Sequence, residues 1–445
     1  MLSAVPDPFH DRRRSTMTAH ARPDSDGISR RSFARLLAAG GSAALLGRTG
    51  LAFERPAPLP QTPAAPNEAF WRSVREQFLM PTDISVMNAA NLCPSSLPVI
   101  EAMYENTKDI DRDASFQNRG KMGAGKVNTR KILAEYLHTT PEQIVITRNT
   151  SEANNLVSSG VVLTADDEVI IFNQNHPSNN LAWKEKAKRY GFTVTELEVV
   201  SPHPGPDYYI DLVRRSITAR TKLLAITHHT NTVGDLFPAK EICQVARERG
   251  VLSLVDGAQS FGLMDVDLSD MQPDFYTGSA HKWPCGPKET GVLFVNERAH
   301  DAIWGTMFSA GRGDVGISRK LEGFGQRDEP AIIAFGEALK FQQQIGMKTI
   351  QARSQELAQS LMEQVSAIDG VTLSTSPDPT RSVAVVVFAI DGLDGRGLFN
   401  ALYDNEKIGV TGRGNGLRIS PHFYNLHSEI DRTVAAIKRY KATGV

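Results

Sequence analysis

The chain has few cysteines, three in 445 residues, and they stand far apart at Cys93, Cys243 and Cys285. No CxxC pair and no cluster with the spacing of metal ligands accompanies them, so the sequence indicates neither a disulfide framework nor a zinc site. A single disulfide would still leave one thiol free. The length suits two or three domains, and 41% hydrophobic residues are typical of a soluble globular protein.

An excess of charge of one sign is also missing. The chain holds 49 basic and 50 acidic residues, a net charge of -1, and therefore has no overall field that would attract nucleic acid or an anionic membrane. The apolar run at 36–47 is short and interrupted by glycine, so it is a poor membrane span. We expect no nucleic-acid partner and no stable membrane span.

The N-terminal region has the parts of an export signal. Arg30 and Arg31 precede Phe33 and the apolar run at 36–47, an order that is typical of a signal peptide and resembles the twin-arginine signal. The alternative is a basic tail with a chance apolar patch, and translation could start at Met1 or Met17. We expect a signal region at 1–50 that is recognised by the twin-arginine translocation machinery, a Pro/Ala-rich linker at 51–66, and a periplasmic enzyme.

Short apolar runs predict a buried parallel sheet. Most of them are continuous rather than alternating, which is typical of strands covered by helices on both faces. Helical stretches such as 239–250 lie between them, and this alternation predicts a doubly wound α/β fold. The predicted strands are 144–147, 168–173, 222–227, 252–256, 274–279 and 291–295.

The character of the sequence changes towards the C-terminus, where helical stretches at 336–346 and 349–367 precede a strand at 382–390 and a helix at 428–441. We therefore predict a large domain at 67–335 and a smaller α+β domain at 336–445. The segment 67–105 is expected to pack on the small domain.

Polar residues follow two of these strands, where ligands bind in open α/β sheets. Asp256 ends one strand in the sequence Asp-Gly-Ala-Gln, and Lys282 follows another in Ser-Ala-His-Lys. Alone, the aspartate would be read as a helix cap and the lysine as a solvated loop residue. The two motifs together, with their strands and spacing, resemble the class V aminotransferases, in the branch of isopenicillin N epimerase and cysteine desulfurase. The resemblance runs from about Asn88 to near the C-terminus and is most specific across 222–295.

The resemblance implies fold type I and pyridoxal 5′-phosphate (PLP) as cofactor. By this likeness Lys282 carries the cofactor as a Schiff base and moves protons at the substrate Cα, while Asp256 favours the protonated pyridine nitrogen. His176 would stack on the cofactor and could relay a proton. The other implied cofactor contacts are Gln259 and Asn231 near the ring hydroxyl, and Thr150, Ser151, Ser279 and His281 at the phosphate.

Towards the C-terminus, Arg418 matches the family position that binds the substrate carboxylate, a task for which a forked guanidinium is suited. By itself it would be read as a surface arginine. The segment 322–330 resembles a loop that approaches the site from a partner subunit, and relatives build each site from two subunits. We therefore expect a homodimer that acts on a small amino-acid substrate.

The sequence departs from the desulfurases, because the segment 408–420 before and around Arg418 holds no cysteine to act as the persulfide nucleophile. Aminotransferase and epimerase activity at Cα are the leading hypotheses, and a lyase that breaks a C–S bond or another β-substituent bond is the alternative. A non-catalytic PLP-binding protein is the hypothesis from another class. A transcriptional regulator is not favoured, because the sequence shows no basic helix-turn-helix segment.

Overall fold

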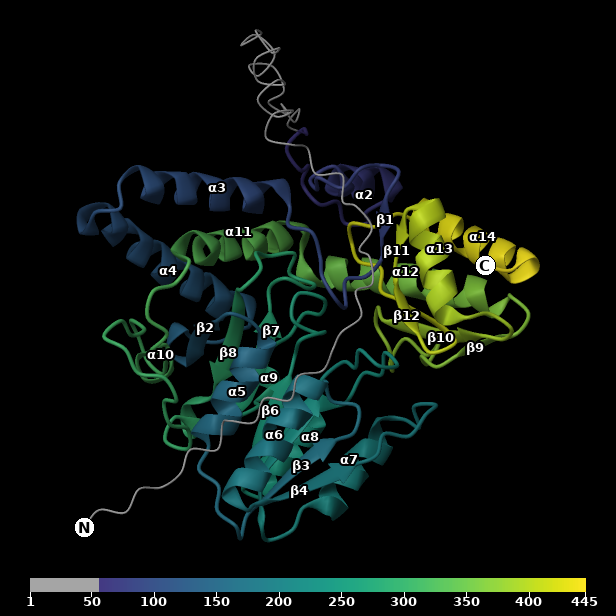
Figure 1. Cartoon of the computed structure of the whole chain (residues 1–445). Helices are drawn as coiled ribbons and strands as arrows, with labels where there is room; N and C mark the ends of the chain where they lie inside the picture. The colour runs from purple at the N-terminus through teal and green to yellow at the C-terminus, as the bar shows by residue number, and fades with distance from the viewer. Residues whose placement is uncertain (1–55) are drawn as a thin grey trace, which may run out of the picture. The chain divides into compact units, whose positions relative to one another are not determined.

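A seven-stranded sheet forms the centre of the fold, in the order β2-β8-β7-β6-β5-β3-β4 (Figure 1). The structure, a computed structural model, describes residues 56–445; the predicted signal region and the first linker residues lie outside them. The strands are β2 (Ile144–Thr147), β3 (Glu168–Phe172), β4 (Thr193–Leu197), β5 (Thr221–Thr227), β6 (Leu252–Asp256), β7 (Phe275–Ser279) and β8 (Gly291–Val295).

The sheet is mostly parallel, as the continuous apolar runs predict. Only β8 runs against its neighbours β2 and β7. Each residue of β2, β3, β7 and β8 is buried, which explains why these strands lack an alternating pattern. The edge strand β4 was not predicted, because its residues are mostly half-buried or exposed and mixed in character.

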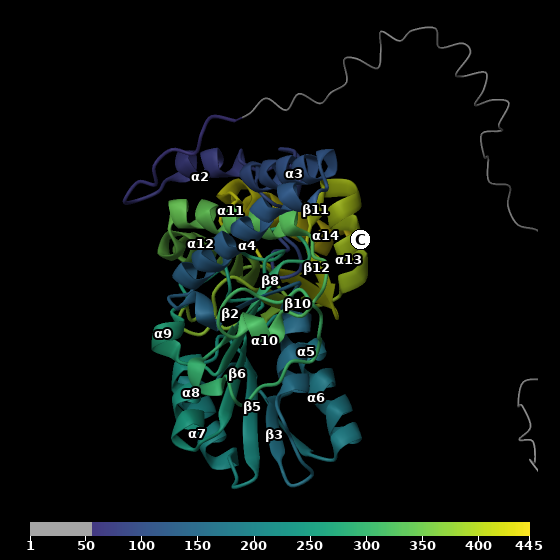
Figure 2. The same ribbon diagram turned by 90° about the vertical axis from the view of Figure 1, so that its left-hand side faces the viewer.

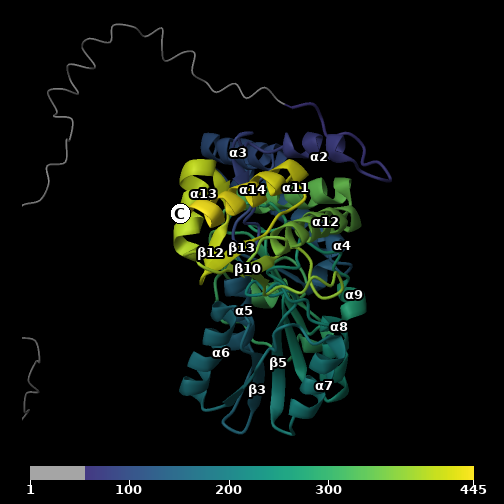
Figure 3. The ribbon, with the colours of Figure 1, turned by 90° about the vertical axis from the view of Figure 1, so that its right-hand side faces the viewer.

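Helices cover both faces of the sheet (Figures 2 and 3). On one face, α5 and α6 pack on side chains such as Val169 and Leu254; on the other, α4, α7, α8 and α11 pack on neighbours such as Ile170 and Val255. The helices of this part are α3 (Leu97–Arg112), α4 (Phe116–Tyr136), α5 (Thr150–Gly160), α6 (Pro177–Tyr190), α7 (Pro206–Ser216), α8 (Ala239–Glu248), α9 (Leu268–Met271), α10 (Ser318–Leu321) and α11 (Glu329–Ile345), with short 3-10 turns at Pro141–Gln143 and Glu297–Ala299.

The C-terminal part contains a second, four-stranded antiparallel sheet in the order β12-β13-β10-β9. The strand expected at 382–390 begins later, at Val386, where regular pairing with β13 starts; just before it, the Val385 carbonyl accepts from the Thr375 side chain at 3.3 Å. Its elements are α12 (Met347–Ser366), β9 (Val371–Leu373), β10 (Val386–Ile390), α13 (Gly395–Glu406), β11 (Ile408–Gly409), β12 (Thr411–Arg413), β13 (Gly416–Ile419) and α14 (His427–Thr443).

The first described segment packs on this C-terminal part. Helix α2 (Glu68–Arg75) contributes Phe70, Trp71 and Val74 to a core shared with α12, α13 and α14. Strand β1 (Ser85–Val86) pairs in parallel with β11, and Asn88 bridges to Ser420. The chain from Asn88 to Asn91 is thereby held between the two sheets. Among the helices of residues 56–445, none is both long and apolar enough to cross a lipid bilayer.

Candidate active site

A cavity of about 300 Å³ lies where β6 and β7 end and where α5 and α6 begin. All the predicted site residues except Gln259 line it, although they come from segments spread over the whole described chain. The lining residues are Ala90, Asn91, Asn149, Thr150, Ser151, His176, Ser178, Asn231, Asp256, Ala258, Ser279, His281, Lys282 and Arg418.

Asp256 places a fixed carboxylate in this cavity. It is the last residue of β6 and is 1% exposed. Its Oδ2 accepts from the side-chain amide of Asn154 at 2.8 Å, and its Oδ1 accepts from the backbone N–H of Ala258 at 3.1 Å. The Thr277 hydroxyl donates to the side-chain oxygen Oδ1 of Asn154 at 3.0 Å, which fixes the orientation of the Asn154 amide. Within residues 56–445 Asp256 has no ion pair, so its charge is left for a cationic ligand group.

Lys282 brings a primary amine with altered acidity. It lies in the loop after β7, where Cys93 donates its N–H to the His281 carbonyl at 2.8 Å. Burial, opposed by the charge of Asp256 and reinforced by that of Arg418, lowers the pKa of Lys282 to about 8. A much larger share of neutral, nucleophilic amine therefore exists near neutral pH than for an ordinary lysine.

The start of α5 forms the polar end of the cavity. The Ser279 hydroxyl accepts from the backbone N–H of Thr150 at 2.8 Å and shares a hydrogen bond of 2.8 Å with the Thr150 hydroxyl. His281 is half-buried, and burial lowers its pKa to about 4, so its ring is neutral at pH 7. Hydroxyls grouped at a helix N-terminus are suited to bind a phosphate.

His176 stands at the start of α6, half-buried and on the cavity wall. Its Nδ1 accepts from the backbone N–H of Ser178 at 3.2 Å, which places the proton of the neutral ring on Nε2. Burial and the charge of Lys282 lower its pKa, while Asp256 raises it. The residue is therefore a neutral ring that can stack on a flat ligand and offer one N–H.

Gln259 does not line the cavity. It is 2% exposed, its amide nitrogen donates to the Ala90 carbonyl at 3.0 Å, and its oxygen accepts from the indole N–H of Trp283 at 2.7 Å. The residue ties the chain at Ala90 to the lysine loop. Its predicted contact with the cofactor ring stays a prediction.

Arg418 is a buried cation without an acidic partner. It is 7% exposed, and its guanidinium donates at 3.3–3.4 Å to the Asn231 carbonyl, the Asn88 side chain and the Thr411 hydroxyl. Its Nε has no hydrogen-bond partner, and no ion pair joins it to an acid in the described part of the chain. Burial lowers its pKa to about 10, which leaves it charged at neutral pH. A carboxylate ligand would supply the missing partner.

Comparison with known proteins identifies the family. Residues 89–433 match the family model described as aminotransferase class-V. The chain belongs to the class V aminotransferases.

Named relatives of this class V aminotransferase family member have different activities. It is 31% identical over 390 residues to the isopenicillin N epimerase of Amycolatopsis lactamdurans, covering 83% of this chain and 98% of the relative. It is 28% identical over 392 residues to a probable cysteine desulfurase of Methanothermobacter thermautotrophicus, covering 80% and 94%. These relatives therefore carry the names of two different reactions.

Solved structures share the fold. A cysteine desulfurase from Thermococcus onnurineus superposes with a TM-score of 0.74 at 23% identity, covering 83% of this chain and 98% of that one. A cystine C–S lyase in complex with cysteine persulfide gives 0.74 at 21% identity, covering 80% and 98%. These neighbours confirm the predicted fold type I.

Pyridoxal 5′-phosphate is the cofactor of this family member, and the cavity fits it. The unpaired, buried carboxylate of Asp256 complements a protonated pyridine nitrogen. Thr150, Ser151, Ser279 and His281 present hydroxyl, backbone and ring donors to a phosphate. Lys282 lines the same cavity, and its amine would be the group able to hold the cofactor covalently.

Sequence reasoning missed the residues that hold Asp256. Asn154 is fully buried in α5 between the apolar side chains of Ala153 and Leu156, and Thr277 is fully buried in β7. A polar amide on the buried face of a helix was the available signal, because such a group needs a partner. The partner itself is 102 positions away in the sequence.

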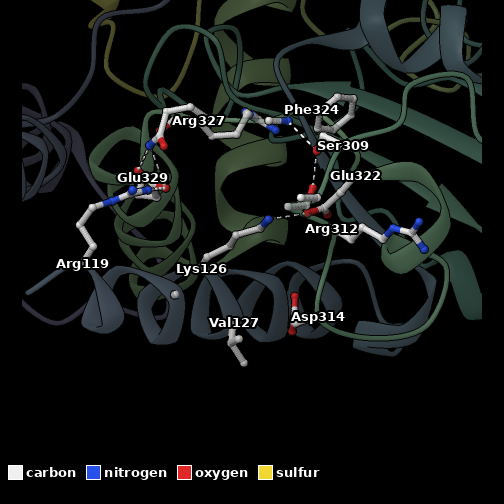
Figure 4. A pocket seen from close by; sticks show the side chains of 15 residues that line it. Arg119, Lys126, Val127, Ser309, Arg312, Asp314, Glu322, Phe324, Arg327 and Glu329 are labelled. Atoms are coloured by element: carbon white, nitrogen blue, oxygen red, sulfur yellow. Dashed lines mark hydrogen bonds and ion pairs between the residues drawn. The ribbon is translucent and has the colours of Figure 1, made fainter. Parts of the chain in front are cut away.

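A second, larger hollow of about 630 Å³ shares no lining residue with the lysine cavity (Figure 4). It lies between α4 and the segment 309–329, and it includes much of the predicted loop at 322–330. Arg119 pairs with Glu329 at 2.9 Å and Lys126 with Glu322 at 2.8 Å across it. These two cations are therefore engaged within the fold, and a third, Arg327, donates to the backbone carbonyls of Ile146 and Thr147 at 3.0 and 3.3 Å.

Proposed function

We propose that this chain is a PLP-dependent enzyme that acts at Cα of an amino acid, as an aminotransferase or an isopenicillin N epimerase-like enzyme. The observation that carries the proposal is that a neutralisable amine and an unpaired guanidinium line one cavity, at Lys282 and Arg418. The first can move a proton, and the second can hold the carboxylate that every amino acid carries.

Each residue has a task that follows from its surroundings. Arg418 binds the substrate carboxylate and so fixes the position of Cα. Lys282, with a pKa of about 8, removes or returns the proton at Cα. His176 holds a proton on Nε2 in the same cavity and is a second group able to transfer one. When bound, PLP supplies the electron sink for the electron pair left at Cα.

A lyase that breaks a C–S or other β-substituent bond is the alternative. The names of several relatives favour it, but none of the three cysteines is among the residues that line the cavity, and all three are buried. Cys93 lies behind the lysine loop, where its backbone N–H donates to the His281 carbonyl at 2.8 Å. Persulfide chemistry on an enzyme cysteine therefore finds no support in this site. Elimination without such a cysteine would start from the same binding of the substrate carboxylate by Arg418. Its products differ from those of transamination and epimerisation, so product analysis distinguishes the reactions.

The decisive experiment follows hydrogen exchange at Cα. The PLP-loaded protein is incubated in D₂O with L- and D-amino acids, with and without 2-oxo acids, and Cα deuteration is followed by NMR. Deuteration that is lost in Lys282→Ala supports the proposal. Appearance of the opposite enantiomer then indicates epimerisation, a 2-oxo acid indicates transamination, and pyruvate with ammonia indicates elimination. Protein that holds PLP but exchanges no Cα hydrogen with any amino acid would be a non-catalytic PLP-binding protein.

We also propose that the chain is exported by the twin-arginine route and acts in the periplasm. The support is the sequence order of Arg30, Arg31 and the apolar run at 36–47. Residues 1–66 fused to a reporter that is active only after twin-arginine export provide the test. Export that is abolished by the double change Arg30→Lys and Arg31→Lys supports the route, and export that survives it rejects the route.

A homodimer is our proposal for the assembly. Large apolar side chains are exposed on α3, on α4 and in the loop before α10: Tyr104 is 62%, Phe116 86%, Phe308 79% and Trp304 63% exposed. Such residues are typical of a protein interface when they gather on one surface. Light scattering should give twice the chain mass, and Phe308→Asp should shift the protein towards monomer. A monomeric wild type would reject the proposal.

A further inference from the structure

The hairpin of β12 and β13 carries a second arginine beside the substrate-binding position. In its antiparallel register Thr411 lies opposite Arg418, and Arg413 lies opposite Gly416. Residues directly opposite one another share a face of the sheet, and so do residues two positions apart on one strand. Arg413 therefore belongs to the same face as Thr411 and Arg418.

That face is the one turned towards the lysine cavity. A Cβ added to Gly412 would meet Phe399 of α13 at 3.2 Å, so the intervening position faces α13 and its neighbours face away from it. Thr411 donates to the Asn88 side chain at 2.8 Å and accepts from Arg418 at 3.3 Å, which shows that this face meets the residues around the site. Arg413, two positions on and exposed, lies at the outer edge of the same face.

The charges at this edge are not balanced within the described chain. The charge of Arg413 adds to burial in lowering the pKa of Arg418, so the two guanidinium groups are close enough to repel one another. Neither has an ion pair with an acidic side chain in residues 56–445. The acidic residue that lines the cavity, Asp256, is already bonded to Asn154 and Ala258. One substrate carboxylate would satisfy Arg418 and leave Arg413 free.

We propose that Arg413 is a specificity-determining residue that binds a second anionic group, so that the preferred substrates are amino acids with an anionic side chain, such as dicarboxylic amino acids. The inference rests on the proposed function, because it needs Arg418 to hold the α-carboxylate. The cofactor phosphate does not need Arg413, since the hydroxyls at the start of α5 serve it from another element. The side-chain carboxylate gains charge-assisted hydrogen bonds from a guanidinium that has no partner of its own.

The test compares pairs of ligands that differ only in one charge. The PLP-loaded full-length protein is titrated with aspartate, glutamate and 2-aminoadipate, each against its side-chain amide and in both enantiomers. The change in the visible absorption of the bound cofactor reports the half-saturation concentration. We expect wild type to favour the acid of at least one pair by about ten-fold, as a charge-assisted hydrogen bond provides.

Variants of Arg413 and Arg396 distinguish a local contact of Arg413 from a general effect of positive charge. Arg413→Gln should abolish the preference for the acid while leaving the half-saturation of the amide within about two-fold, and Arg413→Lys should retain part of it. Arg396→Gln is the matched control, because Arg396 is exposed on α13, the helix that packs on the opposite face of the hairpin. The preference should also weaken at high ionic strength.

The results distinguish the two proposals. If no amino acid changes the absorption of the bound cofactor, the proposed function fails. If amino acids change it but wild type does not distinguish acids from amides, or if Arg413→Gln keeps the preference, the proposed function survives and the role of Arg413 is overturned. An equal loss in Arg413→Gln and Arg396→Gln would reduce the effect to general electrostatics and would also overturn it.

Discussion

The lysine cavity and the larger hollow differ in the partners of their cations. In the larger hollow, Arg119 and Lys126 are paired with Glu329 and Glu322 at hydrogen-bonding distance. In the lysine cavity, Arg418 is buried with neutral and distant partners, and one of its nitrogen atoms has none. Size alone would favour the larger hollow as the active site. The unsatisfied charge of Arg418, more than the volume of either hollow, therefore favours the lysine cavity as the place where a charged ligand binds.

The charges beside the larger hollow hold the fold together. Glu322 is fully buried and accepts from Arg130 at 2.5 Å and from the backbone N–H of Ile146 at 2.7 Å. Burial would raise the pKa of this carboxyl, but Arg130 and Lys126 outweigh it, and the pKa is lowered. The group therefore stays ionised at neutral pH. It fixes the segment after α10 to α4 and β2.

Removal of the lysine amine should give the largest effect in the cavity. Lys282→Ala should lose the covalently bound cofactor and its visible band, and turnover should fall by about a thousand-fold or more because the nucleophile and proton carrier are gone. Absorbance after dialysis and initial rates provide the measurement. Lys288→Ala, an exposed residue of the same loop, is the control and should keep both. A fully active Lys282→Ala would remove the cavity from consideration as the active site.

Neutralisation of Glu322 should affect stability and leave the cofactor unchanged. Glu322→Gln removes one of the two carboxylates that pair with the buried Arg130 and leaves Asp314 at 2.7 Å, so we expect a loss of about 2–3 kcal/mol in the free energy of unfolding, measured with denaturant. Glu337→Gln, which breaks the exposed pair with Lys340, should cost less than about 1 kcal/mol. A Glu322→Gln protein as stable as wild type, or one that loses its cofactor band first, would break the distinction between the two hollows.

Replacement of Arg418 by lysine keeps the positive charge but removes the two parallel N–H donors of the guanidinium. We expect Arg418→Lys to weaken amino-acid binding by about 10- to 100-fold, because a single ammonium cannot make the paired hydrogen bonds of a guanidinium. Titration of the cofactor absorption measures this loss. Arg396→Lys, on exposed α13, should bind as wild type does. Unchanged binding in Arg418→Lys would mean that the carboxylate is held elsewhere.

The smallest expected effect concerns the pH dependence of the rate at which the protein takes up PLP. Burial lowers the pKa of Lys282 to about 8, and only the neutral amine reacts with the cofactor aldehyde. The rate at which cofactor-free protein takes up PLP should therefore rise by about ten-fold from pH 7 to pH 9 and then level off. Stopped-flow absorbance gives the rate. A rate that still climbs steeply above pH 9 would indicate an ordinary lysine.

Local order in the sequence predicted much of the fold. The runs at β2, β6 and β8 are short and mostly apolar, as is typical of buried strands, and their bounds agree with prediction. The half-exposed strand β4 has no such signature and was missed. Strand β10 was predicted too long, because residues 382–385 are buried by loop contacts that no local pattern reveals. Periodicity predicts burial better than it predicts pairing.

The sequence predicted which chemical groups line the site, but it did not predict the contacts that each group makes. Polar residues directly after buried strands, such as Asp256, and those at the starts of helices, such as Thr150, lie in the cavity as expected. Gln259 stands in the same motif as Asp256, yet its amide is used by Ala90 and Trp283. Neighbours in a motif can face different surroundings, since the chain turns between them.

The sequence by itself determined which groups are available: a carboxylate, an amine and a guanidinium, at Asp256, Lys282 and Arg418. Only the tertiary structure decided their states. Asn154 reaches Asp256 across 102 positions of sequence, and the burial of Lys282 lowers its pKa to about 8. The hairpin register places Arg413 on the same face as Arg418, and neither arginine forms an ion pair within the described chain. The physical reason is that pKa values and hydrogen bonds depend on distances between residues that folding alone brings together.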